Sequence, residues 1–344
     1  MVSKMRQRVC FHFLSAYLEQ NKIAVRQPAL SRVTASGCGC MIVFARLSKC
    51  FRFAQKVKRL ILNADDFGMT HGVNEGIIRA HREGILTSAT LMADGEAFGD
   101  AVEKAKANKN LGIGCHLVLV GGKCVAPREL IASLADAEGN LPNSLAVFAA
   151  KVSAGIIRVD EIGIELRAQI EKIRAAGIAL THLDTHKHTH AHPRVMKALA
   201  KVANECGIRR VRKPIENLRD SWGTTRIDSH GTSGQIVAAG AVRAVASQFQ
   251  AIAKKYGLLS PDYFLGLAMT GKLGPATLGL VISALEDGTT EIMLHPGVCD
   301  ADLERSGSRL QHQREDEMAG LMDPLVHDTV TKLGIRLINY GELN

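Results

Sequence analysis

The chain has 344 residues, of which 46% are hydrophobic and 22% are charged, and its formal net charge is +9. This length suits one large α/β domain or two smaller ones, and the composition is ordinary for a globular enzyme. The excess charge is confined to residues 1–59, which hold 12 Lys and Arg and one acidic residue, whereas the remainder has a net charge of −2. Because the body is not basic, the sequence excludes a nucleic-acid-binding surface there.

Residues 1–57 are predicted to form a basic extension that is disordered or is not part of the native protein. They show no clear hydrophobic period, and small polar residues and glycines interrupt them at 31–39. We expect the extension to be dispensable, and loss of activity in a protein that starts near residue 55 would contradict this. The eight cysteines show no paired CxxC spacing, which favours reduced thiols and a cytoplasmic protein.

From residue 58 to 344, apolar strand-like runs alternate with amphipathic helical stretches, which predicts a parallel sheet with helices outside it. We expect a single (β/α) barrel of seven or eight strands, fully or incompletely closed, with a doubly wound open sheet as the alternative. The strands are predicted at 60–64, 87–92, 112–119, 179–184, 209–213, 263–268, 291–294 and 335–339, and a continuous last helix at 314–333. Long connections at 120–158 and 214–239 are expected over the C-terminal rim.

Two adjacent carboxylates, Asp65 and Asp66, follow the first apolar run and precede Gly68. Neighbouring side chains on a strand point to opposite faces, so we expect the strand to end before this pair. An Asx turn or a helix cap is the ordinary explanation. The alternative is a metal ligand beside a general base.

Histidines mark three other strand ends. Residues 181–192 contain five histidines, which with Asp184 stand two residues apart and share a face if this segment is extended. His186 follows an apolar strand directly, so we expect it to face a cavity, whereas His190 and His192 are expected in a solvated loop. His116 and His295 lie in or after other apolar strands. In a parallel barrel these ends meet on one rim, where imidazole and carboxylate suit a metal site.

Four segments, 63–68, 114–119, 181–190 and 294–296, resemble the signatures of the YdjC-like carbohydrate deacetylases. The resemblance runs from about residue 58 to the C-terminus and leaves the extension unexplained. Residues 81–87, 116–123 and 261–266 look most like the hopanoid-biosynthesis-associated branch, which is thought to remove the acetyl group from an N-acetylglucosaminyl hopanoid.

The resemblance implies that Asp66, His116 and His186 ligate one divalent metal. It also implies that Asp65 is the general base and that His295 is the acid that protonates the leaving amine. We further expect His188 and Arg212 to contact the sugar. Magnesium or zinc is the expected metal, and manganese, cobalt and nickel are left open because this mixed N/O donor set suits all of them.

The function implied is metal-dependent hydrolysis of the N-acetyl group of an N-acetylglucosamine unit on a glycosylated hopanoid lipid. A chito-oligosaccharide such as diacetylchitobiose is the alternative substrate. A non-catalytic sugar- or metal-binding barrel is the alternative of another class, favoured if Asp65 is buried or turned from the cavity. No apolar run reaches the roughly 20 residues that span a bilayer. Peripheral contact with the inner membrane and a homodimer are left open.

Overall fold

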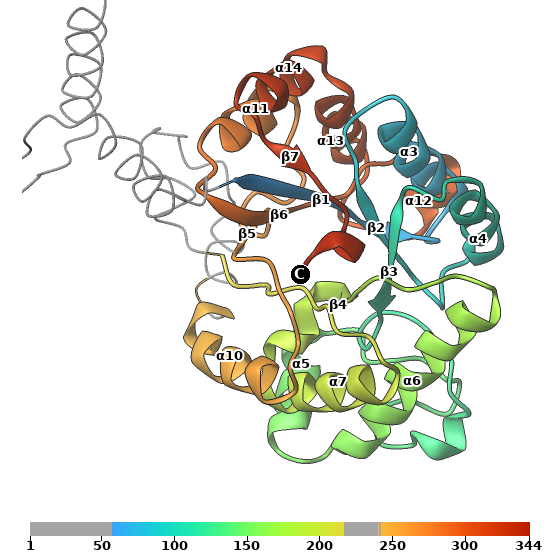
Figure 1. Cartoon of the computed structure of the whole chain (residues 1–344). Helices are drawn as coiled ribbons and strands as arrows, with labels where there is room; N and C mark the ends of the chain where they lie inside the picture. Colours follow the sequence, from blue (N-terminus) through green and yellow to red (C-terminus); the bar gives the residue numbers. More distant parts are fainter. Residues whose placement is uncertain (1–56, 217–239, 241) are drawn as a thin grey trace, which may run out of the picture. The chain divides into compact units, whose positions relative to one another are not determined.

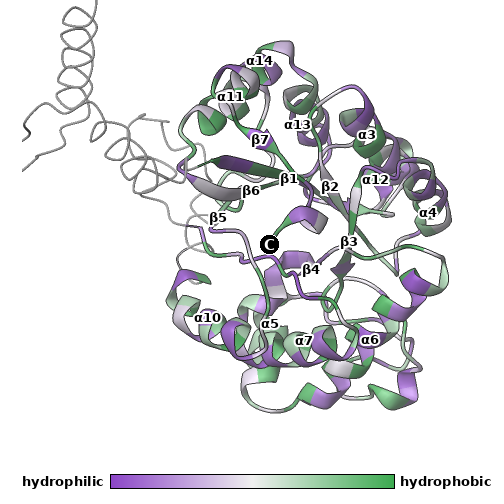
Figure 2. Ribbon diagram, viewed as in Figure 1, coloured by the Kyte–Doolittle hydropathy of each residue, from purple (hydrophilic) through white to green (hydrophobic). Residues whose placement is uncertain are grey.

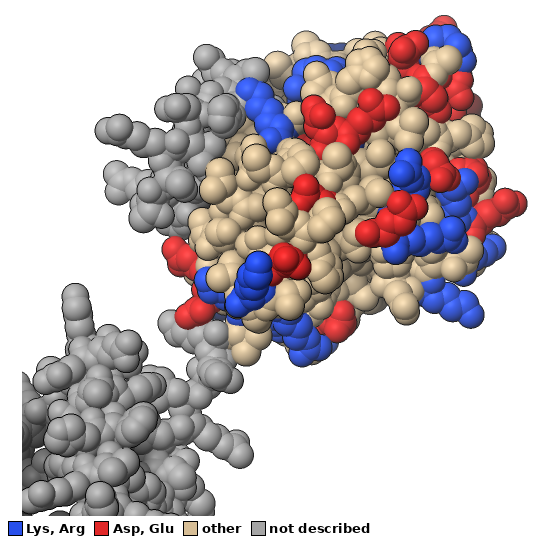
Figure 3. Space-filling model, turned by 90° about the horizontal axis from the view of Figure 1, so that it is seen from above, with Lys and Arg blue, Asp and Glu red and all other residues tan. Residues whose placement is uncertain are grey.

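The computed structural model describes residues 57–216, 240 and 242–344. The predicted extension, apart from residue 57, and nearly all of the 214–239 connection therefore lie outside the described residues. The described residues fall in one unit, Lys56–Asn344. Among them, no helix is both long and apolar enough to cross a membrane. On the face drawn in Figure 3, basic and acidic side chains intermingle.

Seven strands form one sheet in the described part of the chain, and every pairing in it is parallel. Along the sheet they run in the order β4-β3-β2-β1-β6-β5, and β7 also pairs with β1 (Figure 1). The strands are β1 Lys58–Phe67, β2 Ser88–Leu91, β3 Gly112–Leu117, β4 Leu183–Thr185, β5 Tyr263–Leu265, β6 Gly288–Leu294 and β7 Arg336–Leu337.

The sheet curls into a half-barrel that is not fully closed. Past β4, only isolated parallel bridges continue it among the described residues, from Leu183 to Val211 and from Arg210 to Leu259. The predicted strand at 209–213 is thus reduced to bridge residues. An irregular, incompletely closed (β/α) barrel is confirmed.

Helices pack around the sheet, and each outer helix carries both hydrophilic and hydrophobic residues (Figure 2). The first, α3, begins where the Thr70 hydroxyl accepts a hydrogen bond from the Val73 N–H, and its apolar face buries Val73 and Ile77. The α-helices are α3 His71–Arg82, α4 Phe98–Ala107, α5 Leu145–Ser153, α6 Val159–Ala175, α7 Pro193–Glu205, α10 Ala246–Lys255, α11 Pro275–Ser283, α12 Ala301–Arg305, α13 Gln313–Met322 and α14 Pro324–Lys332.

Two helical regions differ from the sequence prediction. The helix expected at 314–333 is divided into α13 and α14, because Pro324 lacks an N–H and the Asp323 side chain caps α14 by accepting from the Leu325 N–H at 2.7 Å. The 120–158 connection, expected to be a loop, contains α5 and the 3₁₀ turn η1 Arg128–Leu130.

The C-terminal turn η3, Tyr340–Glu342, lies in the middle of the ring of strands in Figure 1. Tyr340 is fully buried, and it packs with Ile61, Ile338 and Leu343 in a small apolar cluster separate from the main core. The last residues of the chain therefore fill part of the barrel interior beneath the strand ends that carry the candidate site.

Candidate active site

The end of β1 contains an irregularity that allows two adjacent carboxylates to join one polar centre. The strand continues to Phe67, so the expectation that it ends before Asp65 was wrong. Instead its register with β2 shifts between Ala64 and Phe67, and Asp66 has a left-handed φ of 66°. Such a bulge redirects side chains, and a left-handed non-glycine residue is a strained feature often found at functional sites.

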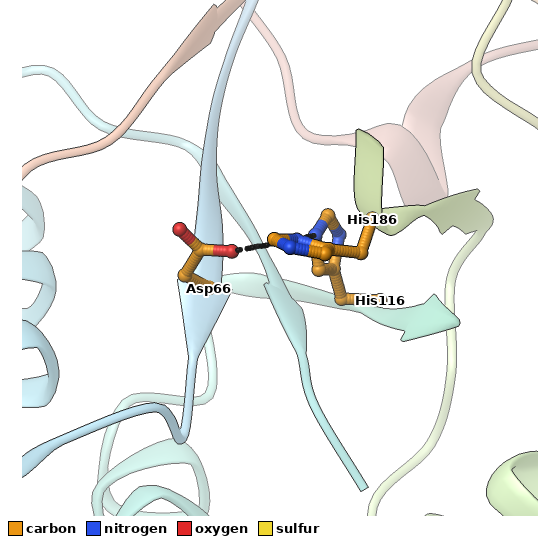
Figure 4. A group of neighbouring side chains, drawn as sticks. All are labelled: Asp66, His116 and His186. Carbon is orange, nitrogen blue, oxygen red and sulfur yellow. Dashed lines mark hydrogen bonds and ion pairs between the residues drawn. The ribbon is translucent and has the colours of Figure 1, made fainter. Parts of the chain in front are cut away.

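Asp66, His116 and His186 form the Asp66 triad, and their side chains point toward one another (Figure 4). The Asp66 Oδ1 lies 3.5 Å from His116 Nε2 and 3.4 Å from His186 Nδ1. The two imidazole nitrogens are 3.3 Å apart. The donors come from β1, β3 and η2, the 3₁₀ segment His186–Ala191 that follows β4. The structure thus brings together the three residues predicted to be ligands.

This triad fits one divalent cation. Carboxylate and imidazole donors bind such metals at about 2.0–2.2 Å, so donors that share a metal stand about 3–3.5 Å apart. The three separations above fall in that range. Asp66 Oδ1 is moreover buried without a hydrogen-bond partner, although buried polar atoms are normally paired. The donor set alone does not select the metal.

His116 is held in place by a carboxylate on the neighbouring strand. It pairs in register with Asp184, and its Nδ1 lies 2.8 Å from the Asp184 Oδ1. Thr90 donates its hydroxyl to the other Asp184 oxygen at 3.1 Å. Burial lowers the pKa of His116, but the charge and hydrogen bond of Asp184 together with Asp66 and Asp65 outweigh burial and raise that pKa well above its ordinary value. This arrangement orients Nε2 toward Asp66, as second partners of ligating histidines commonly do.

The second oxygen of Asp66 is occupied by Arg314 of α13, whose Nη2 donates to Oδ2 at 2.7 Å. Burial would raise the pKa of Asp66, but Arg314 and the two histidines outweigh burial and hold it well below its ordinary value. Asp66 is therefore an anion with one paired oxygen and one oxygen that faces the histidines.

Asp65 belongs to a second group, the Arg212 cluster, which consists of Arg212, Asp65, Asp184 and Glu291. Arg212 donates from Nη1 and Nη2 to the two oxygens of Asp65 at 2.7 and 2.6 Å. It also pairs through Nη1 with Asp184 and through Nε with Glu291, each at 2.7 Å. Arg212 is fully buried, so the structure places it among carboxylates, and its predicted contact with the sugar stays a prediction.

His295 follows β6 directly, one residue past Leu294, which is the last residue of β6 in register with β1 and pairs with Ala64. Glu317 of α13 accepts the His295 backbone N–H at 2.6 Å, and the same Oε2 lies 3.7 Å from His295 Nδ1. Nδ1 is buried without a hydrogen-bond partner. A carboxylate therefore stands beside the imidazole expected to act as an acid.

The histidines after His186 do not share a face, as an extended segment would require. Lys187 and His188 adopt left-handed φ values of 53° and 52°, which turn the chain. The expected solvated loop was wrong for His190, which is fully buried between the Thr185 hydroxyl at 2.6 Å and the Arg212 carbonyl at 3.0 Å. His192 instead caps α7 by accepting from the Arg194 N–H.

His188 lies half-buried, with its ring edge against Phe264 at a centroid distance of 5.8 Å. Burial, with a smaller effect of Arg212, lowers the pKa of His188 well below its ordinary value, and its Nδ1 is buried without a hydrogen-bond partner. A neutral imidazole with an unpaired nitrogen suits a hydrogen bond from a hydroxyl group, and its contact with the sugar stays a prediction.

Sequence reasoning missed several residues of the site. Arg314 and Glu317 lie three apart on α13, and nothing in their helical pattern distinguishes them from surface charges. Glu291 had a usable signal, because it is the charged residue in β6, a strand that is buried over residues 289–294.

The fold and the polar centre define a (β/α)-barrel protein with a three-donor metal-type site on its strand ends. The family model described as YdjC-like protein matches residues 59–332, and the chain belongs to this family.

Its relatives include the carbohydrate deacetylase of Clostridium beijerinckii, which is 32% identical over 289 residues, 83% of this chain and 100% of the relative. The chitooligosaccharide deacetylase of Yersinia enterocolitica is 33% identical over 288 residues, 83% of this chain and 99% of the relative. Among solved structures, one from Enterococcus faecalis V583, titled as a candidate cellobiose-phosphate cleavage protein, has a TM-score of 0.64 at 27% identity. That match covers 83% of this chain and 98% of the other.

Proposed function

We propose that this protein is a metal-dependent carbohydrate deacetylase that removes the acetyl group from an N-acetylglucosamine unit. The observation that carries the proposal is the Asp66 triad, whose three donors converge while Asp66 Oδ1 has no hydrogen-bond partner. The names of the relatives support the reaction class, since both of those described above are called deacetylases. Asp66, His116 and His186 would hold the metal, which when bound supplies Lewis-acid polarisation of the amide carbonyl and of a water.

Asp65 is proposed as the base that takes the proton of the attacking water. Its Oδ1 accepts from Arg212 and, at 3.0 Å, from Asn63, whereas Oδ2 accepts the Arg212 bond alone. A carboxylate oxygen has two lone pairs, so Oδ2 is the atom with a lone pair left for that proton. Arg212 orients the carboxylate and fixes which lone pair is free.

His295 is proposed as the acid that gives a proton to the departing amine. It directly follows β6, the strand that pairs with β1, and Glu317 lies beside its Nδ1. Glu317 lies on the Nδ1 side of the ring, so Nε2 is proposed as the nitrogen that faces the leaving group. Base and acid are thus proposed to come from β1 and from the residue that follows its neighbour β6.

The substrate is proposed to be a lipid-linked N-acetylglucosamine of the hopanoid type. Four exposed apolar side chains, Leu130, Leu145, Val147 and Ile156, lie in the 120–158 connection, and α5 of that connection contacts η2. Exposed apolar side chains that gather in one connection favour a substrate with an apolar part. A chito-oligosaccharide is the alternative, supported by the name of the Yersinia relative.

A non-catalytic sugar- or metal-binding barrel is the second candidate, because Asp65 is only 3% exposed. Asp66 is also 3% exposed and His116 is 1% exposed, so burial is shared by the whole centre and does not set Asp65 apart. This weakens the observation that favours the second candidate.

The test is acetate release by the purified full-length protein with diacetylchitobiose and, separately, with N-acetylglucosaminyl hopanoid in mixed micelles. We expect release with the second substrate to be the faster. Asp65→Asn should abolish release and leave metal content at the wild-type level. Metal binding without acetate release from either substrate would support the non-catalytic barrel.

A further inference from the structure

The C-terminal turn reaches the candidate catalytic base through a chain of buried polar contacts. The hydroxyl of Tyr340 donates to Glu291 Oε2, and Glu291 Oε1 accepts from Arg212 Nε at 2.7 Å. Arg212 in turn holds both oxygens of Asp65. Tyr340, Glu291 and Arg212 are all fully buried, so water does not compete for these bonds.

We propose that Tyr340 and Glu291 are positioning residues for deacetylation, which fix the guanidinium of Arg212 and through it the carboxylate of Asp65. This inference rests on the proposed function, in which Asp65 is the base. Neither Tyr340 nor Glu291 forms a hydrogen bond or ion pair with the Asp66 triad. Their effect on the reaction therefore acts through Arg212.

The surroundings of Tyr340 support a fixed position. Its ring is stacked on His182 at a centroid distance of 3.7 Å and an interplanar angle of 6°. Its backbone N–H donates to the Ser88 hydroxyl at 3.1 Å. Burial lowers the pKa of His182 to about 3, so this ring stays neutral and the stack keeps its charge state at any working pH. A side chain held on its ring face and on its backbone aims its hydroxyl at one acceptor.

Glu291 makes the series of contacts from Tyr340 to Asp65 dependent on pH. The groups that act on it are Arg212 from the 209–212 segment, Tyr340 from the C-terminal turn and Asp65 from β1. Burial raises the pKa of Glu291 to about 7, against the opposing effect of Arg212. Above that pH Glu291 is an anion that accepts strongly from Arg212 Nε. Below it the carboxyl is neutral, the bond weakens and Arg212 is held less firmly.

The test compares Tyr340→Phe and Glu291→Gln with the wild type, using full-length, metal-loaded protein and the faster of the two substrates above. Tyr340→Phe keeps the ring that stacks on His182, and Glu291→Gln keeps an oxygen that accepts from Arg212. We expect kcat to fall about tenfold in each, with KM and metal content unchanged, because a small misplacement of a base reduces the chemical step. The double variant should be no slower than the slower single variant, since both act through Arg212.

Two controls separate positioning from a merely structural role. Tyr263→Phe removes a hydroxyl that donates to Glu286 on the surface and should leave kcat unchanged. The ratio of wild-type to Glu291→Gln activity should rise as the pH increases through about 7, where Glu291 ionises. Wild-type kcat in both variants, or a loss of metal content equal to the loss of rate, would overturn the inference.

A failure of the proposed function is distinguishable from a failure of this inference. If the wild type releases no acetate from either substrate, the proposed function fails. The NMR resonance of the Arg212 Nε–H then tests the buried contacts from Tyr340 to Asp65 independently of activity. It should titrate near pH 7 in the wild type and lose that titration in Glu291→Gln. A resonance that does not respond to either substitution contradicts the coupling.

Discussion

The Asp66 triad and the Arg212 cluster are adjacent in the barrel, but their charged atoms are paired differently. In the triad, Asp66 Oδ1 has no hydrogen-bond partner and two imidazole nitrogens face it. In the cluster, Arg212 meets three carboxylates at 2.6–2.7 Å. Asp65, His116 and Asp184 also lie close enough to hold an ion, but Arg212 already supplies the positive charge there. The comparison supports the proposal that a cation binds in the triad and not in the cluster.

The largest effect should follow from removing a donor of the triad. His186→Ala should abolish stoichiometric metal binding and lower kcat/KM about a thousandfold, because Lewis-acid stabilisation is lost. The His186 side chain is 18% exposed, so we expect little change in the free energy of unfolding of the metal-free protein. Metal content by mass spectrometry and acetate release provide the check.

His327→Ala is the matched control for that substitution, since His327 is exposed on α14, a helix that carries none of the three donors. It should retain metal and activity. Full metal occupancy in His186→Ala would show that the cation binds elsewhere. The Asp66 triad would then differ from the Arg212 cluster in hydrogen bonding but not in metal binding.

Removing the cation of the cluster should affect stability rather than metal binding. Arg212→Met leaves Asp65, Asp184 and Glu291 buried without their shared counter-charge, which should lower the free energy of unfolding by about 3–5 kcal/mol. Urea unfolding of the metal-free proteins measures this. Arg79→Met, which breaks an exposed pair with Glu83, should cost about 0–1 kcal/mol. Equal costs in the two variants would show that the cluster is not a structural unit.

The third effect is a pH dependence of the free energy of unfolding that arises in the Arg212 cluster. Burial raises the pKa of Glu291 from 4.5 to about 7, so between these values the folded protein keeps a proton that the unfolded chain has lost. The free energy of unfolding therefore falls as the pH rises through this window, by about 3 kcal/mol. Glu291→Gln lacks this carboxyl, and its stability relative to wild type should increase from pH 5 to pH 8. Parallel stability curves would contradict the assignment.

The sequence was sufficient to predict how the triad assembles. Strand ends of a parallel barrel meet on one rim, so the two aspartates and the strand-end histidines were expected to converge. The resemblance then singled out Asp66, His116 and His186, which the structure brings together. Their roles as ligands remain a prediction. The division of the last helix was predicted wrongly, although Pro324 gave a signal for it, because a proline cannot continue α13, which ends at Met322.

The contacts that Arg212 makes with its buried carboxylates could not be predicted from the sequence. Arg212 and Glu291 are 79 residues apart, and Tyr340 reaches Glu291 from the C-terminal turn. Such contacts depend on how strands close in space, which local periodicity does not encode. His190 was misjudged because it was expected in a solvated loop, whereas the chain turns through left-handed residues at Lys187 and His188 and His190 is buried.

The smallest effect tests how closely the lower part of the barrel is packed. A Cβ at Gly114 would stand 2.4 Å from the His182 ring, and that ring cannot retreat because Tyr340 is stacked on it at 3.7 Å. Gly114→Ala should therefore lower the free energy of unfolding by about 1–3 kcal/mol, as overpacking does. Gly163→Ala on α6, whose added Cβ would meet its nearest atom at 3.8 Å, should be neutral or stabilising by up to about 1 kcal/mol. Gly114 lies two residues before His116, so the metal content of Gly114→Ala shows whether the strain reaches the triad. Retention of metal would show that the strain stays in the layer of His182 and Tyr340. Loss of metal would show that displacing this layer also displaces the triad.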